Sequence, residues 1–218
     1  MHQFPHQRVS PPRGGSRRAA FALWIVILTT VSALVGWSQT PGEGVAPPGS
    51  EASPRSRIEW LAAHPDHSAA RTVVSDVLRD AESVSELIFL SERALPVLPP
   101  DVQAEGYRAV GAVLRSARRL EEAANHYGHA FDASGRTDLM SLYLQAQLLF
   151  ELGDRAGADA RVRKVLAETT DYELRRRAYT LAALVAYESG QESEARRMLR
   201  TLASLNDPEY VEVESLVL

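Results

Sequence analysis

The chain of 218 residues is 45% apolar and 24% charged, so it can form one or two globular domains with a sizeable core. Its net charge of −4 argues against nucleic-acid binding, and the lack of cysteine excludes disulfides, cysteine nucleophiles and thiolate metal sites. Residues 1–57 hold six arginines and two acidic residues, whereas residues 58–218 hold eighteen basic and twenty-six acidic residues. A basic N-terminal part is thus joined to an acidic remainder.

The N-terminal part has the composition of a membrane anchor. Residues 1–18 are polar and basic, with proline and glycine, which predicts a disordered tail. Residues 19–37 contain no charge, and as a helix they span about 28 Å, close to the roughly 30 Å hydrocarbon core of a bilayer. Trp37 suits the far interface, and the preceding arginines orient the C-terminal part away from the cytoplasm. We therefore predict a single-pass signal anchor.

A cleaved signal peptide is the alternative. Val31-Ser32-Ala33 is an acceptable cleavage site, and cleavage there would yield a secreted protein. It would also leave the apolar Leu34, Val35 and Trp37 on the new terminus, which favours the anchor. The mass of the mature protein distinguishes the two. The alanine- and arginine-rich composition indicates a bacterial source, with the anchor in the cytoplasmic membrane and the domain periplasmic or extracellular.

Residues 38–57 are rich in proline, glycine and serine, which predicts a linker between the membrane and a folded domain. From 58 to 218 the apolar residues recur at helix spacing without a strand pattern, so we expect an all-α domain. A short helix at 58–63 is followed by one at about 66–79. The Ser83-Val84-Ser85-Glu86 capping box opens another, and Asp101 is a plausible N-cap for the next.

A pattern of paired helices recurs from residue 101 onward. The second helices carry three triads at spacings of four and three residues, offset by 35 and 37 residues: Ala123, Tyr127 and Ala130; Ala158, Val162 and Val165; and Ala195, Leu199 and Leu202. The preceding helices carry matching sets: Tyr107, Val110, Gly111 and Leu114; Leu142, Gln145, Ala146 and Leu149; and Tyr179, Ala182, Ala183 and Ala186. Gly153 and Gly190 supply the turn between the two helices of a pair.

These residues resemble the tetratricopeptide repeat, a helix pair of about 34 residues. The resemblance implies an α-solenoid of stacked helix pairs after a single N-terminal transmembrane helix, because one pair cannot bury its apolar face alone. The implied units are a degenerate repeat at about 66–100, repeats at 101–136, 137–171 and 172–208, and a C-terminal cap at 209–218. The apolar cap has an alternative role as a ligand for a partner domain.

The chain departs from the repeat pattern in three ways. Arg118-Arg119 stands where glycine is usual, so one continuous helix is possible there. Gln145 and Ala182 replace a leucine. The loop proline is clear only at Pro99 and Pro208.

No catalytic motif accompanies the repeats, so we predict neither an enzyme nor a cofactor. The histidines His64 and His67, with Asp66, or His126 and His129, could supply two metal ligands, but spacing suggests no third. An enzyme or metal-binding protein that uses these residues therefore remains the alternative of a different class.

The function predicted is partner binding. In the family a concave groove is lined by first-helix residues, which correspond here to Arg108, Arg115, Tyr143, Gln147, Phe150, Thr180, Leu184 and Tyr187. Their aromatic and arginine character suits an apolar or helical segment with some negative charge. We expect a membrane-anchored adaptor or scaffold for a protein or peptide, with an accessory, chaperone-like or assembly factor of an envelope or secretion complex as alternative. A further alternative is a scaffold that assembles from copies of the same chain into homo-oligomers.

Overall fold

The computed structural model describes residues 45–49 and 51–205, all within one compact unit of the chain, residues 42–218. The predicted basic tail at 1–18, the anchor at 19–37 and the cap at 209–218 lie outside the described residues. In the part that is described, no helix is both long and apolar enough to cross a membrane.

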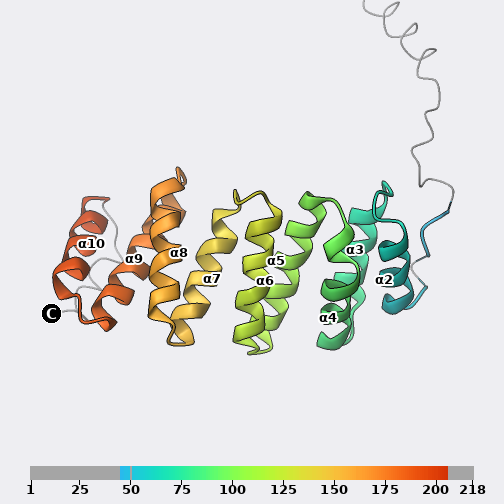
Figure 1. Ribbon diagram of the computed structural model, residues 1–218, viewed down its shortest axis with the longest axis horizontal. Helices are drawn as coiled ribbons and strands as arrows, with labels where there is room; N and C mark the ends of the chain where they lie inside the picture. Colours follow the sequence, from blue (N-terminus) through green and yellow to red (C-terminus); the bar gives the residue numbers. More distant parts are fainter. Residues whose placement is uncertain (1–44, 50, 206–218) are drawn as a thin grey trace, which may run out of the picture. The chain divides into compact units, whose positions relative to one another are not determined.

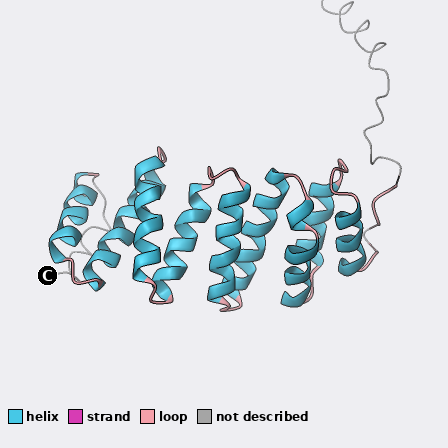
Figure 2. Cartoon of the chain, viewed as in Figure 1, coloured by secondary structure: helices cyan, strands magenta, loops and turns pink. Residues whose placement is uncertain are grey.

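The described residues form helices and no strand, which confirms the all-α prediction (Figures 1 and 2). The helices are α2 (Pro54–Ala63), α3 (Ala70–Asp80), α4 (Val84–Arg93), α5 (Pro100–Ser116), α6 (Leu120–Ala133), α7 (Leu139–Glu151), α8 (Arg155–Glu168), α9 (Tyr172–Glu188) and α10 (Glu192–Ser204), with a 3-10 turn at Leu95–Val97.

In the C-terminal part of the described chain, helices that follow each other in sequence pack against each other. From α5 to α10 each helix contacts the next one, and α7 also contacts α9 (Figure 1). The stretch predicted as a degenerate repeat, 66–100, is built differently. Its two helices, α3 and α4, each pack against α2 and α5, without the close mutual pairing of α5 with α6.

The buried side chains form two clusters. One joins α2 to α6, and the other joins α7 to α10. Each cluster also includes one buried residue from a helix of the other cluster. Leu148 of α7 belongs to the first cluster, and Phe131 of α6 belongs to the second. The interface of α6 and α7 is therefore where the two clusters interlock.

The residues of the three predicted triads occupy the core. All nine have at most 3% of their surface exposed, from Ala123 to Leu202. Small residues allow the helices to approach closely, since a Cβ added at Gly111 would lie 3.3 Å from the Tyr127 ring and 3.4 Å from the Ala123 carbonyl oxygen. Of the signature residues in the first helices, Tyr107, Leu114, Leu142, Ala146 and Ala183 are buried, whereas Leu149 and Tyr179 are half-buried.

The turns inside the three helix pairs share one geometry. Arg118, Gly153 and Gly190 have φ values of 61°, 84° and 73°. In each turn the next N–H donates to a carbonyl five residues back, as from Arg119 to Leu114 at 2.9 Å. A continuous helix across Arg118-Arg119 is therefore wrong, because α5 ends at Ser116 and Arg118 adopts the left-handed conformation that glycine takes in the other two turns.

This geometry makes Arg118→Gly a stabilising substitution. Arg118 is exposed, and glycine removes the steric cost of a Cβ at positive φ, which outweighs the added entropy of the unfolded chain. We expect the free energy of unfolding to rise by about 0.5–1 kcal/mol, measured by urea denaturation. The neighbouring Arg119→Gly is the control: Arg119 has a φ of −89°, so it should lose stability, and an equal gain at both positions would contradict this reason.

The first helix begins earlier than predicted. Ser53 caps α2 by accepting from the Ser56 N–H, and Pro54 occupies the first turn, so 54–57 are helix and not linker. Arg57 is buried and donates to Asp80 Oδ2 at 2.8 Å and to the Ala52 carbonyl oxygen at 3.0 Å. The end of the predicted linker is thus fixed to the domain.

Two other helix starts differ from the sequence prediction, and the start of α4 agrees with it. Helix α3 starts at Ala70, after turns across 64–69, and α5 starts at Pro100, so Asp101 lies in the first turn and is no N-cap. Ser83 caps α4, accepting from the Glu86 N–H at 3.4 Å, and Asp171 caps α9, accepting from the Leu174 N–H at 2.7 Å.

Candidate functional site

The predicted partner-binding residues lie on three first helices with equal spacing. Arg108 and Arg115 are on α5; Tyr143, Gln147 and Phe150 are on α7; and Thr180, Leu184 and Tyr187 are on α9. The α7 and α9 sets are spaced i, i+4 and i+7, so each forms one stripe along its helix. We call these two stripes the first-helix row. Because α7 contacts α9, the stripes belong to neighbouring helices.

Tyr143 does not line a surface. Only 6% of it is exposed, and it packs in the second core cluster with Phe131 and Ala146. The row is therefore exposed unevenly. Gln147, Phe150, Thr180 and Leu184 are half-buried, and Tyr187 is 40% exposed. An apolar strip that includes Phe150, Leu184 and Tyr187 is what remains accessible to a partner.

The two arginines of α5 bind acidic residues of the following helix pair. Arg108 Nη1 lies 3.1 Å from Asp138 Oδ2, and Arg115 Nη2 lies 3.6 Å from Glu151 Oε1. Arg71 of α3 contacts Asp101 and Glu105 of α5 in the same manner. Such partly exposed pairs contribute little stability. They do mean that Arg108 and Arg115, the charges expected to attract an acidic segment, already have acidic partners within the chain.

The histidine pairs do not assemble a metal centre. The ring of His64 stacks on Trp60 at 5.0 Å, and His67 accepts from the Ala69 N–H at 3.1 Å. His126 and His129 lie 6.3 Å apart between ring centres, both against Tyr107. Within residues 45–49 and 51–205, no group of three histidines or carboxylates could hold a metal ion. Burial lowers the pKa of His126 below its ordinary value, which suits a packed neutral imidazole.

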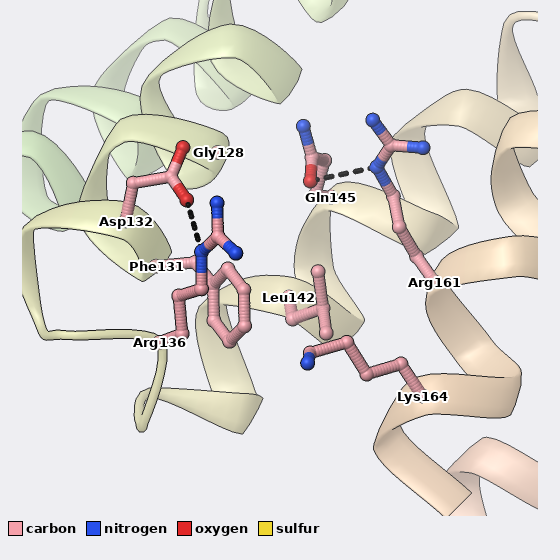
Figure 3. Close-up of a pocket in the computed structure, with 8 residues that line it drawn as sticks. All are labelled: Gly128, Phe131, Asp132, Arg136, Leu142, Gln145, Arg161 and Lys164. Atoms are coloured by element: carbon pink, nitrogen blue, oxygen red, sulfur yellow. Dashed lines mark hydrogen bonds and ion pairs between the residues drawn. The ribbon is translucent and has the colours of Figure 1, made fainter.

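A hollow of about 280 Å³ lies on the other side of α7, between α6 and α8 (Figure 3). We call it the α6–α8 hollow. Phe131 and Leu142 supply its apolar lining, and Arg136, Arg161 and Lys164 bring three positive charges against the single carboxylate of Asp132. Gly128 and Gln145 complete the lining.

Three helices position Arg161. Its Nε donates to Gln145 Oε1 at 2.8 Å, and its Nη1 donates to the Gly157 carbonyl oxygen at 3.1 Å. Gly128 leaves room for the Gln145 amide, because a Cβ there would lie 2.6 Å from Gln145 Nε2. Arg161 is half-buried, and no carboxylate in the described residues neutralises it.

The other two cations of the hollow are held more loosely. Arg136 Nε lies 3.3 Å from Asp132 Oδ1, with both side chains exposed. Lys164 Nζ lies 2.9 Å from Glu168 Oε1. It also lies 5.6 Å from the centre of the Phe131 ring, which Figure 3 shows beside it. Arg136 and Lys164 are thus each paired with a carboxylate, and Arg161 is the cation of the hollow that has none among the described residues.

Sequence reasoning did not identify this hollow, although one signal was present. Gln145 was recognised as a departure from the leucine of the repeat pattern, and it is the residue that holds Arg161. The three partners Gly128, Gln145 and Arg161 are each 16 or 17 residues from the next, on separate helices, so their contact depends on how the helices pack.

A comparison with protein families found no family that matches this chain, and a comparison with curated proteins found no match either.

Proposed function

We propose that this chain is a membrane-anchored helical-repeat protein of the tetratricopeptide type, which binds a protein or peptide partner and catalyses no reaction. The observation that supports this best is the recurrence of one buried triad in three successive helix pairs, each closed by the same left-handed turn. Stacked pairs of this kind present extended faces on which partner segments can lie.

The partner-binding surface in this proposal is the apolar strip of the first-helix row. Tyr187 is exposed, and Leu184 and Phe150 are half-buried beside it, on helices that contact each other. Exposed aromatic residues next to aliphatic ones are typical anchors of interfaces. Since Arg108 and Arg115 are already paired, the partner segment is apolar more than acidic.

The anchor at 19–37 would hold this domain near the membrane on the extracytoplasmic side. A partner in the same compartment would then meet the domain at a raised local concentration. A more specific form of this proposal is an accessory or assembly role in an envelope complex.

Photo-crosslinking in cells tests the surface. A photoreactive phenylalanine analogue in place of Tyr187 in the full-length chain should yield a discrete adduct with a partner protein. The same analogue in place of Arg196, which is exposed on α10, should yield none. Tyr187→Ala should weaken capture of the identified partner about tenfold or more without changing the melting temperature. Equal adducts at both positions, or undiminished capture by Tyr187→Ala, would exclude the first-helix row as the site.

A further inference from the structure

We propose that the α6–α8 hollow is a docking site for the acidic C-terminal segment of the same chain, with Glu214 binding among Arg136, Arg161 and Lys164. This inference is independent of the partner proposed above, because it concerns a different face of α7 and an occupant within the chain.

Charge complementarity is the first reason. Residues 206–218 contain four acidic residues, Asp207, Glu209, Glu212 and Glu214, and no basic one. The hollow has the opposite charge: Arg136 and Lys164 each pair with one carboxylate, and the charge of Arg161 remains in excess. Arg161 is held by Gln145 and Gly157, and among the described residues it has no carboxylate partner, so an incoming carboxylate need not displace an ion pair of that part of the chain.

The residue pattern is the second reason. In an extended segment Glu212, Glu214 and Leu216 fall on one face, because successive side chains alternate. A face with two carboxylates followed by a leucine matches a basic rim around the apolar Phe131 and Leu142. The volume of the hollow suits one or two side chains and no large ligand.

The reach of the chain is the third reason. The Tyr172 hydroxyl donates to the Leu205 carbonyl oxygen at 2.5 Å, so the end of α10 lies beside the start of α9. From there back to Lys164, eight residues before Tyr172, the path is at most about 30 Å. Nine residues of extended chain from Leu205 to Glu214 span about 30 Å, so Glu214 reaches the hollow. Asp207, two residues past Leu205, can extend only about 7 Å beyond the end of α10, which makes it the control carboxylate.

The composition of the chain allows a clean test, because Lys164 is its only lysine. A water-soluble carbodiimide joins an amine directly to a carboxylate in contact with it, and protease digestion with mass spectrometry then identifies the linked residues. In the full-length protein in detergent, we expect a link from Lys164 to Glu214 or Glu212 within the monomer. The link from Lys164 to Glu168, 2.9 Å away, is the internal reference.

Two substitutions, each with a control, test the contact between the C-terminal segment and the hollow. Glu214→Gln should lower the yield of the tail link at least several-fold relative to the reference, whereas Asp207→Asn should leave it unchanged. Arg161→Gln should also lower it, whereas Arg200→Gln, on exposed α10 surface, should not. A higher salt concentration should reduce the link by screening exposed charges.

Three results would overturn the inference. The first is that Lys164 couples only to Glu168, as expected if the C-terminal segment caps α10 instead. Tail links could occur only in crosslinked dimers, which would make a second copy the occupant. The tail link could also persist unchanged in Glu214→Gln and Arg161→Gln together. A partner adduct at Tyr187 would be unaffected by any of these.

Discussion

Ala123→Arg is expected to unfold the domain. Ala123 has no exposed surface, and its carbonyl oxygen lies within 3.4 Å of where a Gly111 Cβ would stand, so α5 and α6 meet there without spare volume. An arginine would overfill this contact and bury a charge without a partner. We expect a loss of more than about 4 kcal/mol, which approaches the whole stability of a domain at the lower end of the usual range of about 5–15 kcal/mol.

The measurement is a thermal melt followed by circular dichroism. The control is Ala112→Arg, the same substitution at an exposed alanine of α5, which should keep the melting temperature within a few degrees. A cooperative melt of Ala123→Arg at the temperature of the parent would refute the repeat spacing on which the fold prediction was based.

Leu148→Ala is expected to separate the unfolding of the two core clusters. Leu148 has no exposed surface, and although it lies on α7 it packs in the cluster of α2 to α6. Its truncation should cost about 2–5 kcal/mol, the range for buried leucines. Because the loss falls on the interface of the clusters, α7 to α10 should then open without α2 to α6.

Hydrogen exchange followed by mass spectrometry measures this directly. Peptides from α7 to α10 should exchange faster than in the parent, and faster than peptides from α5 and α6. The matched control is Leu152→Ala, since Leu152 is 39% exposed and should lose much less. Uniform acceleration across all helices would mean that the domain unfolds as one unit despite its two clusters.

The fold could be predicted as far as local spacing determines it. Tyr127, Val162 and Leu199 were recognised as core residues because helix periodicity is a short-range property, and all three are buried. Gly153 and Gly190 were placed in turns for the same reason, and both have positive φ. Arg118 escaped prediction because arginine has no intrinsic preference for its conformation; the packing of α5 on α6 imposes it.

The candidate site could be predicted only in part, because its properties depend on distances between helices. Sequence alone cannot show that Arg108 meets Asp138, thirty residues away, or that Tyr143 turns into the core and not toward a partner. The α6–α8 hollow likewise exists because Gly128 on one helix makes space for Gln145 on another. The spacing of residues along a single helix does not show how much space two packed helices leave between them.

The contact of each helix with the next one, from α5 to α10, has a mechanical consequence. If the chain is tethered at its N-terminal side and a partner pulls on α9, tension passes mainly through these interfaces one after another, and only the direct contact of α7 with α9 bypasses α8. The weakest interface would then yield first, while the pairs on either side of it keep their own cores. A stack of this kind extends stepwise under load, one helix interface at a time.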